Sequence, residues 1–367
     1  MLKNKTIAVV VPAYNEESQI AMVIETMPDF VDRMIVVNDC SKDRTRGIVE
    51  GYWSSEFNKG IFIPDASNQK FDGKYERANR IVQELRIVEE KYFVKSEMKN
   101  AGDENERIIL INHLKNSGKG AGVASGYKWA RDHNIDCIAT MDGDGQMDPA
   151  ELFSICRPIL DNEVDYVKGN RLIHRSSMFV IPKIRFFGNS ILSILTKLSS
   201  GYWRVSDTQT GYTAISLKAL QSLSLHKIYK NYGYPNDMLV KLNIAYCTIK
   251  EIEIKPVYQI GENSKMKIGK VIPRVSWLLF RSFFKRLWIK YLFRDFHPLF
   301  LLYNMSFILF IISFPYLLKI LNHAFILKSQ ANPVTVLAFI FLAISAFQSL
   351  LFAMWMDIQD NDRLYKD

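Results

Sequence analysis

Two uncharged stretches near the C-terminus constrain this chain more than any other feature of its sequence. Pro298–Leu318 has 21 residues and Val334–Met356 has 23, and neither contains a charged side chain. As helices that rise about 1.5 Å per residue, each would reach roughly 30 Å, the thickness of the hydrocarbon layer of a bilayer. We therefore predict two transmembrane helices within 298–356, followed by a cytosolic tail at 357–367. Two helices buried in the core of a soluble domain are the alternative.

The excess positive charge is confined to the stretch just before the first uncharged segment. The chain has 47 Lys and Arg against 38 Asp and Glu. Nine of the basic residues lie between Lys265 and Arg294, where no acidic residue occurs; without these nine, 38 basic residues face 38 acidic ones. A patch confined in this way indicates an anionic partner at one place. It argues against a protein that coats nucleic acid over its whole surface.

Within this basic stretch, residues 271–294 repeat apolar side chains at intervals of three and four, which predicts one helix with an apolar face. That face carries Trp277, Phe280, Phe284, Leu287 and Tyr291. Another face carries Arg274, Arg281 and Lys285. Such a helix directly before a span is typical of the bilayer interface, and nucleic-acid binding is the weaker alternative. We predict a basic loop and amphipathic interface helices over 261–297.

Residues 1–260 alternate short β-branched runs with helical stretches, which predicts an α/β layer fold with a mostly parallel sheet. Strands are expected at Ile7–Val11, Met34–Val37, Ile108–Ile111, Cys137–Met141, Tyr166–Lys168, Ala214–Ser216 and Thr248–Ile254. Helices are expected at Glu17–Thr26, Arg44–Tyr52, Gly122–Asp132, Pro149–Leu160 and Asp237–Ala245. Residues 53–107 have the character of an insertion with a charge-rich helix near Glu76–Lys95. Ligands of such sheets bind beyond the carboxyl ends of the strands.

The strongest chemical signal is Asp142-Gly143-Asp144-Gly145-Gln146, which follows an apolar strand. In extended chain, residues two apart project to the same side, so the two carboxylates and Gln146 would face one way. Hard oxygen ligands of this kind suit Mg²⁺ or Mn²⁺. Mg²⁺ fills its other positions with water and phosphate oxygens, which fits a nucleotide diphosphate. A solvated acidic turn would show the same letters.

Three further loops carry polar residues at strand ends. Tyr14 and Glu16 follow the first strand, and Asp39 follows the second. An aromatic ring can stack on a nucleotide base and an acid can bind its polar groups, although a helix N-cap is the better explanation of either loop taken alone. The glycine-rich loop at 117–122 contains Lys119 but has glycine where a nucleotide-hydrolysing P-loop requires Ser or Thr.

In combination these loops resemble the family-2 glycosyltransferases of the GT-A fold, and more narrowly the polyprenyl-phosphate (dolichol-phosphate) hexosyltransferases. The resemblance runs in family order through about 270 residues and leaves out the segment 53–107. Its motifs are VVPAYNEE (10–17), VVNDCSKDRT (36–45), GKGAGVASGY (118–127), MDGDGQMDP (141–149), GNRL (169–172), IRFFGNSIL (184–192), DTQTGYTAIS (207–216), GYPNDML (233–239) and NSKMKIGKVI (263–272).

The resemblance implies a role for particular residues. The nucleotide sugar would be held by Pro12, Tyr14, Glu16, Val37, Asp39, Lys119, Asp142, Gly143 and Lys265, the last on a loop that closes over the donor. A Mg²⁺ or Mn²⁺ ion would be held by Asp142, Asp144 and Gln146. The acceptor phosphate would be held by Arg171, Arg185 and Asn189. The catalytic residues would be Asp144, Arg171 and Asp237.

This chain departs from the family pattern at three places. It has Asn38-Asp39-Cys40 where the family often has Asp-Asp-Gly, and Thr213 where an Arg is common. The Arg that usually precedes the Ser264-Lys265 pair is missing. These changes bear on the sugar and acceptor contacts and leave the metal ligands intact.

The resemblance implies inverting transfer of a hexose from GDP-mannose, UDP-glucose or UDP-GlcNAc to a polyprenyl phosphate. The second pKa of a phosphate monoester is about 6, so this acceptor is largely dianionic at neutral pH and needs no base. One alternative is a hydroxyl acceptor with Asp237 as the base, and another is a non-catalytic membrane scaffold. The loop Lys319–Pro333 has only two Lys, whereas the flank before the first span is rich in basic residues. That asymmetry predicts a cytosolic catalytic domain.

Overall fold

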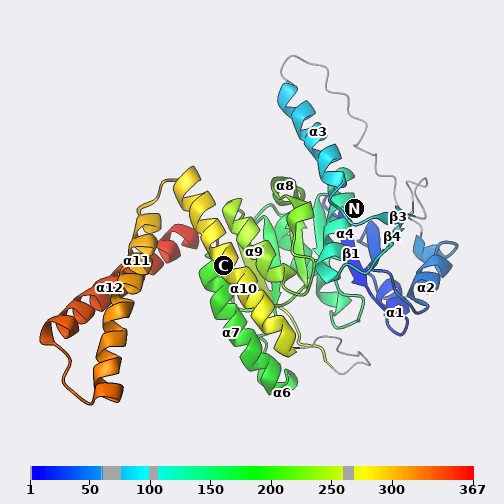
Figure 1. Cartoon of the computed structure of the whole chain (residues 1–367). Coiled ribbons are helices and arrows are strands. Elements are labelled where there is room, and N and C mark those ends of the chain that lie inside the picture. Colours follow the sequence, from blue (N-terminus) through cyan, green and yellow to red (C-terminus); the bar gives the residue numbers. More distant parts are fainter. Residues whose placement is uncertain (1, 59, 61–75, 99–105, 259–267) are drawn as a thin grey trace.

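The computed structural model describes residues 2–58, 60, 76–98, 106–258 and 268–367, in which eight strands form one sheet (Figure 1). The strands are β1 (Ile7–Ala13), β2 (Arg33–Asn38), β3 (Ser96–Met98), β4 (Ile108–His113), β5 (Cys137–Thr140), β6 (Tyr166–Asn170), β7 (Thr213–Ser216) and β8 (Ile249–Glu253). Their order in the sheet is β3-β4-β2-β1-β5-β7-β6-β8. All seven strands predicted from the sequence are present, with ends shifted by at most two residues, and β3 was not predicted.

The sheet is mostly parallel, as predicted. β1 runs parallel to β2 and β5, β2 to β4, and β6 to β8. β7 is antiparallel to both of its neighbours, and β3 is antiparallel to β4. The carboxyl ends of β1, β2, β4 and β5 therefore meet at one edge, where the polar loops follow them.

Helices cover both faces of the sheet. The helices α1 (Ile20–Glu25), α2 (Thr45–Gly51) and α5 (Leu152–Leu160) pack on one face, and α4 (Lys119–Asp132), α8 (Leu217–Ser222) and α9 (Tyr234–Ile244) pack on the other. Successive side chains of a strand point to opposite faces. Thus Val9 of β1 packs in the core beneath α1, α2 and α5, and Val10 packs in the core beneath α4, α8 and α9.

The segment 53–107 adds a helix that projects from the domain. This helix, α3 (Arg77–Glu90), confirms the helix predicted near Glu76–Lys95, and it stands out from the body of the fold (Figure 1). Its base is tied to α4, because Arg131 lies 3.5 Å from Glu89 and Lys128 lies 3.4 Å from Glu90. Residues 59, 61–75 and 99–105 of this segment lie outside the described part.

Three helices lie side by side between the sheet and the C-terminal part of the chain. They are α7 (Lys183–Ser200), which follows the short α6 (Ser177–Val180), α9, and α10 (Ile268–Trp288), which continues as a π-helical turn over Ile289–Arg294. Leu192 of α7 packs with Val275 and Leu279 of α10. The helix predicted over 271–294 is therefore confirmed.

Part of the apolar face predicted for α10 is exposed, and the rest is buried. Trp277 and Phe280 are 67% and 56% exposed, whereas Leu287 and Tyr291 are completely or almost completely buried. The difference arises because the carboxyl end of α10 passes beneath the last two helices, which cover it. Arg274, Arg281 and Lys285 lie on the open side, as expected.

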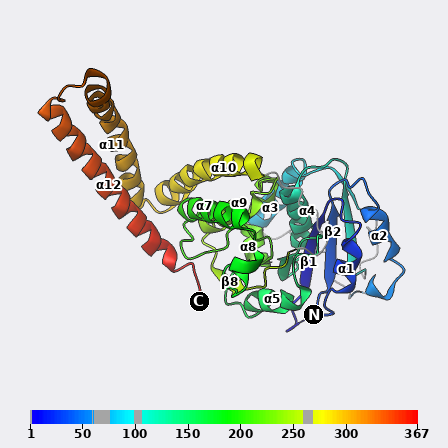
Figure 2. The same ribbon diagram turned by 90° about the horizontal axis from the view of Figure 1, so that it is seen from below.

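Two long helices form a hairpin that extends away from the domain (Figure 2). They are α11 (Pro298–Leu321), continued by a π-helical turn at Asn322–Leu327, and α12 (Pro333–Asp362), and they pack against each other. Both are long and apolar enough to cross a membrane, and only 17% of each apolar window is buried. Two helices hidden in a core, the alternative from the sequence, are not what the structure shows.

The chain returns to the sheet after α12. Leu364 is buried in the core on the α4 side, and Tyr365 forms a parallel bridge with Ile249 of β8. The backbone N–H of Ile249 donates to the Leu364 carbonyl (2.7 Å), and the N–H of Lys366 donates to the Ile249 carbonyl (2.9 Å). The segment predicted as a tail therefore covers the outer edge of the sheet.

Candidate active site

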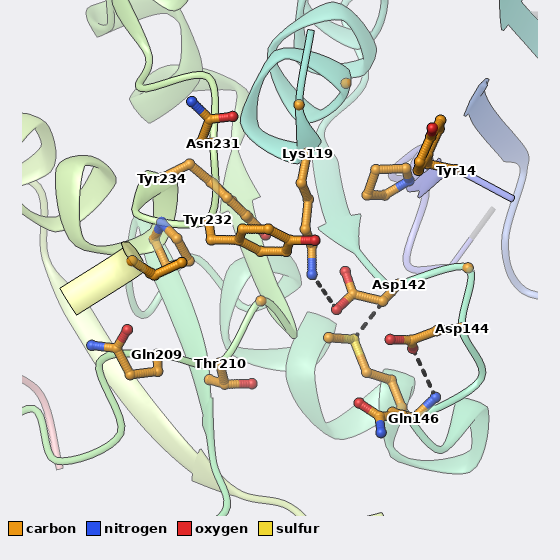
Figure 3. A pocket seen from close by; sticks show the side chains of 18 of the residues that line it. Tyr14, Lys119, Asp142, Asp144, Gln146, Gln209, Thr210, Asn231, Tyr232 and Tyr234 are labelled. Carbon is orange, nitrogen blue, oxygen red and sulfur yellow. Dashed lines mark hydrogen bonds and ion pairs between the residues drawn. The ribbon is translucent and has the colours of Figure 1, made fainter. Parts of the chain in front are cut away.

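A cavity of about 510 Å³ opens beyond the carboxyl ends of the parallel strands (Figure 3). The loops after β1, β2 and β5 form one side, and residues of α7, α9 and α10 form the other. Its volume is within the range of about 300–1,000 Å³ that is usual for small-molecule sites. The structure brings together in this lining the predicted residues Pro12, Tyr14, Glu16, Asp39, Lys119, Asp142, Gly143, Asp144, Gln146, Arg171 and Asn189.

The loop after β5 presents two carboxylates to the cavity, Asp142, which is buried, and Asp144, which is half-buried. Asp142 is 9% exposed, and its Oδ1 has no hydrogen-bond partner within the described part of the chain. Its Oδ2 accepts a hydrogen bond from the Lys119 ammonium (Figure 3). Burial and the neighbouring Asp142 carboxylate raise the pKa of Asp144 to about 6. The pair thus holds more negative charge than the protein neutralises, which favours a bound cation.

These residues fit a divalent metal ion. Asp142 and Asp144 supply hard oxygen ligands, one of them unpartnered, and Gln146 lies beside them with its N–H 3.1 Å from Asp144 Oδ1. Within the described ranges, no group of three or more His, Cys, Asp or Glu could hold a metal. Mg²⁺ commonly takes only one or two carboxylates and completes its shell with water and phosphate oxygens. Asp142, Asp144 and Gln146 would therefore hold the ion together with a phosphate-bearing ligand.

Lys119 provides a permanent cation next to the carboxylates. Burial disfavours its charged form, but Asp142 and Asp144 raise the pKa of Lys119 above its ordinary value. The residue stands at the first turn of α4, directly after Gly118. Gly118 has a φ of +94°, and an added Cβ would lie 2.6 Å from the Lys230 carbonyl oxygen, so only glycine fits this turn.

A second unpartnered oxygen faces the cavity from α9. The hydroxyl of Tyr234 is buried and has no hydrogen-bond partner among the described residues. A Cβ at Gly211 would lie 2.7 Å from this hydroxyl and 3.6 Å from Asp142 Oδ1, so the glycine keeps the space between them open. The sequence analysis assigned no role to Tyr234, although it lies in the GYPNDML motif.

Asp39, in the lining of the same cavity, is held by three hydrogen-bond donors. Its carboxylate accepts hydrogen bonds from His113 Nδ1 (2.7 Å) and from the backbone N–H groups of Ser117 (2.9 Å) and Gly118 (2.7 Å). Burial alone would raise the pKa of Asp39, but these hydrogen bonds hold it below its usual value. His113 Nε2 lies 2.9 Å from the Ser125 hydroxyl. This buried chain of three side chains was not predicted.

Arg171 is fixed by an acid that the sequence analysis also missed. Its Nε and Nη2 donate to Asp207 Oδ2 (2.8 Å) and Oδ1 (3.1 Å), and Nη1 donates to the Tyr258 hydroxyl (3.4 Å). Asp207 is only 1% exposed. Burial opposes the charge on the guanidinium, but Asp207 raises the pKa of Arg171. Asp207 opens the motif DTQTGYTAIS, which was the only signal for it.

Two predicted residues do not reach the cavity. The Val37 side chain is completely buried in the core because β2 is an inner strand, and it lies beneath Gly122. Asp237 is absent from the lining; it accepts hydrogen bonds from Lys241 and from the backbone N–H of Tyr229 (2.8 Å), so it stabilises the start of α9. The Arg185 side chain and Lys265 lie outside the described part of the structure.

A family model named "Glycosyl transferase family 2" matches residues 8–84 and 93–224, more than half of the chain. The match extends into both ends of the segment 53–107 that the motif resemblance left out. It includes the loops that carry Asp39, Asp142 and Asp144.

Three curated relatives share a polyprenyl phosphate in their names. The UDP-N-acetylglucosamine–dolichyl-phosphate N-acetylglucosaminyltransferase of Methanococcus voltae is 28% identical over 274 residues, 73% of this chain and 93% of the relative. A dolichyl-phosphate beta-glucosyltransferase of Trichomonas vaginalis is 24% identical, over 77% of this chain and 74% of the relative. The undecaprenyl-phosphate mannosyltransferase of Micrococcus luteus is 25% identical, over 46% of this chain and 68% of the relative.

Proposed function

The chain belongs to glycosyl transferase family 2, and from that premise we propose that it transfers a hexose from a nucleotide sugar to a polyprenyl phosphate. The observation that carries the proposal is the carboxylate pair, Asp142 and Asp144, facing a cavity whose other wall is formed by helices next to an apolar hairpin. The names of the three relatives support the acceptor class, since each contains a dolichyl or undecaprenyl phosphate. Their sugars differ, so we propose the reaction class without choosing among the donors.

The donor would lie along the strand-end loops. The nucleoside would occupy the end near Tyr14 and Asp39, and its diphosphate would extend toward Asp142 and Asp144. A divalent ion bound there would offset the charge that develops on the leaving nucleoside diphosphate. Lys119 and Arg171 add fixed positive charge to the same cavity.

The reaction we propose is an in-line displacement with inversion at the anomeric carbon. A phosphate oxygen of the acceptor forms the new bond to that carbon, and the bond to the diphosphate breaks. Because the acceptor is already anionic, no side chain has to remove a proton. The position of Asp237 supports a phosphate acceptor over a hydroxyl acceptor, because its carboxylate is engaged by Lys241 and Tyr229 outside the cavity.

The hairpin would place the proposed reaction at the membrane. Exposing a polyprenyl chain to water costs about 0.8 kcal/mol per CH₂, so the enzyme must work where the lipid lies. We propose that α11 and α12 span the bilayer, that residues 261–297 lie at its surface, and that residues 1–260 form the catalytic domain on the cytosolic side. The basic flank before α11 and the two Lys of the loop Lys319–Pro333 support this orientation.

The proposal is tested by supplying both substrates to the full-length protein in membranes. Polyprenyl phosphate is mixed with labelled UDP-GlcNAc, UDP-glucose or GDP-mannose, each with Mg²⁺ or Mn²⁺, and label is measured in an acid-labile lipid fraction. We expect one donor to label the lipid, and Asp144→Asn to abolish the signal. Undiminished transfer in the presence of a chelator, or transfer only to a hydroxyl acceptor, contradicts the proposal.

A further inference from the structure

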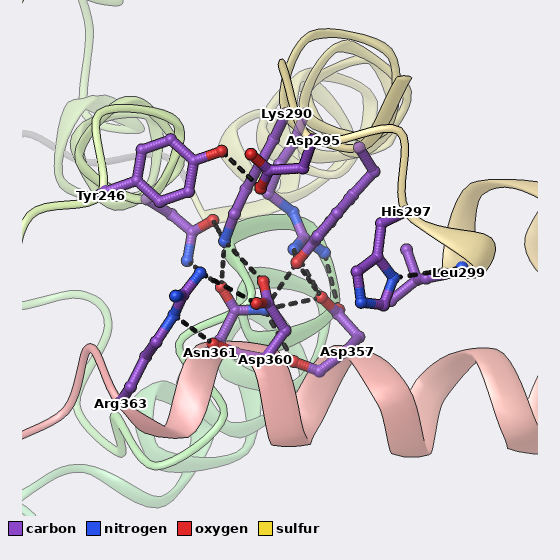
Figure 4. A network of polar contacts seen from close by, with 12 residues as sticks. Tyr246, Lys290, Asp295, His297, Leu299, Asp357, Asp360, Asn361 and Arg363 are labelled. Carbon is purple, nitrogen blue, oxygen red and sulfur yellow. Dashed lines mark hydrogen bonds and ion pairs between the residues drawn. The ribbon is translucent and has the colours of Figure 1, made fainter. Parts of the chain in front are cut away.

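Two cations of the basic stretch are buried and therefore do not face an anionic partner outside the protein. Arg286 is 1% exposed and Lys290 is not exposed at all. Both lie where α10 and its π-helical turn meet the last turns of α12 (Figure 4). Their partners belong to α12 on one side and to the catalytic domain on the other. We call Arg286, Lys290, Asp357 and Asn361 the hairpin clamp.

Arg286 joins the end of α12 to the carboxyl end of α7. Its Nη1 and Nη2 donate to Asp357 Oδ1 (2.7 Å) and Oδ2 (2.8 Å), and Asp357 is fully buried. The same guanidinium donates through Nε to the Ser199 carbonyl (2.9 Å) and through Nη2 to the Leu198 carbonyl (3.0 Å). An added Cβ at Gly201 would lie 2.5 Å from Nη1, so glycine is needed for this approach.

Lys290 joins the end of α12 to the carboxyl end of α9. Its Nζ donates to Asn361 Oδ1 (2.6 Å) and to Asn243 Oδ1 (3.2 Å), and it lies 3.2 Å from Asp360. Asn361 Oδ1 also accepts a hydrogen bond from Asn243 Nδ2 (2.7 Å). The two cations thus bind α12 to two different helices of the catalytic domain.

Those two helices also line the active-site cavity, at positions away from their clamped ends. Asn189 and Leu192, near the middle of α7, and Tyr234 and Pro235, at the start of α9, belong to the lining. Asn189 and the clamped Ser199 are about 15 Å apart along the helix, so a shift at the clamped end would also move the lining residues. The wall of the cavity that faces the hairpin is therefore built on helices whose far ends are fixed to α12.

We propose that Arg286 and Lys290 are positioning residues. They hold the cavity wall formed by α7 and α9, where the acceptor would bind, at a fixed place relative to the hairpin and hence to the bilayer. This inference rests on the proposed function. Replacing a buried ion pair by apolar residues of similar size is often neutral for stability, so these charges are not explained by folding alone. The clamp should matter most when the acceptor phosphate is presented at the height of a bilayer surface. A short acceptor that diffuses freely can follow a displaced wall.

The test compares two acceptors with one set of full-length variants. The acceptors are a long-chain polyprenyl phosphate embedded in liposomes and a two-isoprene phosphate in solution. The variants are Asp357→Asn and the double variant Arg286→Met/Asp357→Leu, which leaves no buried charge unpaired. The control is Asp362→Asn, because Asp362 is also at the end of α12 and forms an exposed ion pair with Arg204 (2.9 Å).

We expect kcat/KM for the embedded acceptor to fall at least about tenfold in both variants, because small displacements of reacting groups cost this much or more. We expect less than about threefold change for the soluble acceptor, and no change in the donor KM. Equal losses on both acceptors, or no loss on either, overturn the clamp proposal. The double variant decides the matter if Asp357→Asn does not fold. A wild-type protein that glycosylates neither acceptor would instead refute the proposed function.

Discussion

Two groups of charged side chains in this protein differ in whether their carboxylate oxygens have partners. At the cavity, Asp142 and Asp144 lie side by side, one oxygen of Asp142 has no partner within the described residues, and the pKa of Asp144 is raised to about 6. At the hairpin clamp, both oxygens of Asp357 are paired: Arg286, Tyr291 and Asn361 donate to Oδ1, and Arg286 and Trp203 donate to Oδ2.

The difference separates groups that await a ligand from groups that hold the protein together. Leaving a buried charge without a partner costs free energy, so such a group in a cavity is a candidate for binding a ligand. A fully paired charge has no capacity left for a ligand. Substitutions at the carboxylate pair should therefore lower turnover without lowering stability. Removing one partner in the clamp should lower stability, together with transfer to the embedded acceptor.

The largest effect is expected at the carboxylate pair. Asp144→Asn should lower turnover by about three orders of magnitude, because a main ligand for the charge-stabilising ion is lost. The midpoint of thermal unfolding should stay the same or rise, since the substitution removes repulsion between two neighbouring carboxylates. Calorimetry and transfer assays on the same preparation check both statements. A variant that unfolds early would remove the contrast with the clamp.

Removing one partner of the hairpin clamp should, in contrast, lower stability. Arg286→Met leaves Asp357 buried and uncompensated, which typically costs about 3–5 kcal/mol in the free energy of unfolding. Denaturant titration of the detergent-solubilised protein measures this loss, and Asp362→Asn serves as the exposed control. Unchanged stability of Arg286→Met would show that water or a relaxed helix end can replace the guanidinium.

Arg171 tests a case between the two extremes, because it lies in the cavity and is also paired. Asp207→Asn should reduce turnover by about a hundredfold, since it releases the guanidinium from its bidentate partner and from its orientation. The KM for the donor should change less than turnover does. An equal rise in KM without loss of turnover would assign Arg171 to substrate binding alone.

The sequence predicted the layers of the fold and the strand-end loops well, for reasons specific to them. β1, β2, β4 and β5 are short apolar runs directly followed by polar residues, so the pattern itself marks where each strand ends. The pairs Arg171–Asp207 and Arg286–Asp357 are 36 and 71 residues apart, and no local pattern connects their members. For the same reason, the charge count assigned Arg286 and Lys290 to the basic patch, although each has an acidic partner in α12.

A smaller effect is expected where Asp39 is held by His113. His113→Ala should weaken binding of the free nucleoside diphosphate about tenfold, because Asp39 loses a hydrogen bond of 2.7 Å and with it part of its fixed orientation. His113→Asn, which can still donate from a similar position, should recover most of the affinity. Calorimetric titration measures both. As a control, His133→Ala changes a histidine that stacks on Trp129 and is not in the lining.

The smallest effect is expected at Asp237. If the acceptor is a phosphate, Asp237→Asn should change turnover by less than about fivefold, because its carboxylate binds Lys241 and the Tyr229 N–H and not a substrate. Initial rates at saturating substrates provide the measurement. A loss of several orders of magnitude would support the alternative of a hydroxyl acceptor. Asp237 would then belong, like Asp142 and Asp144, to the residues that act on the substrates.

The strand-like contact of residues 364–366 with β8 has a consequence for biosynthesis. These residues follow the hairpin in the chain, so the ribosome makes them only after it has synthesised α11 and α12. Until then the outer edge of β8 stays uncovered, and an uncovered strand can pair with other chains. Completion of the sheet thus waits for the synthesis of the apolar hairpin.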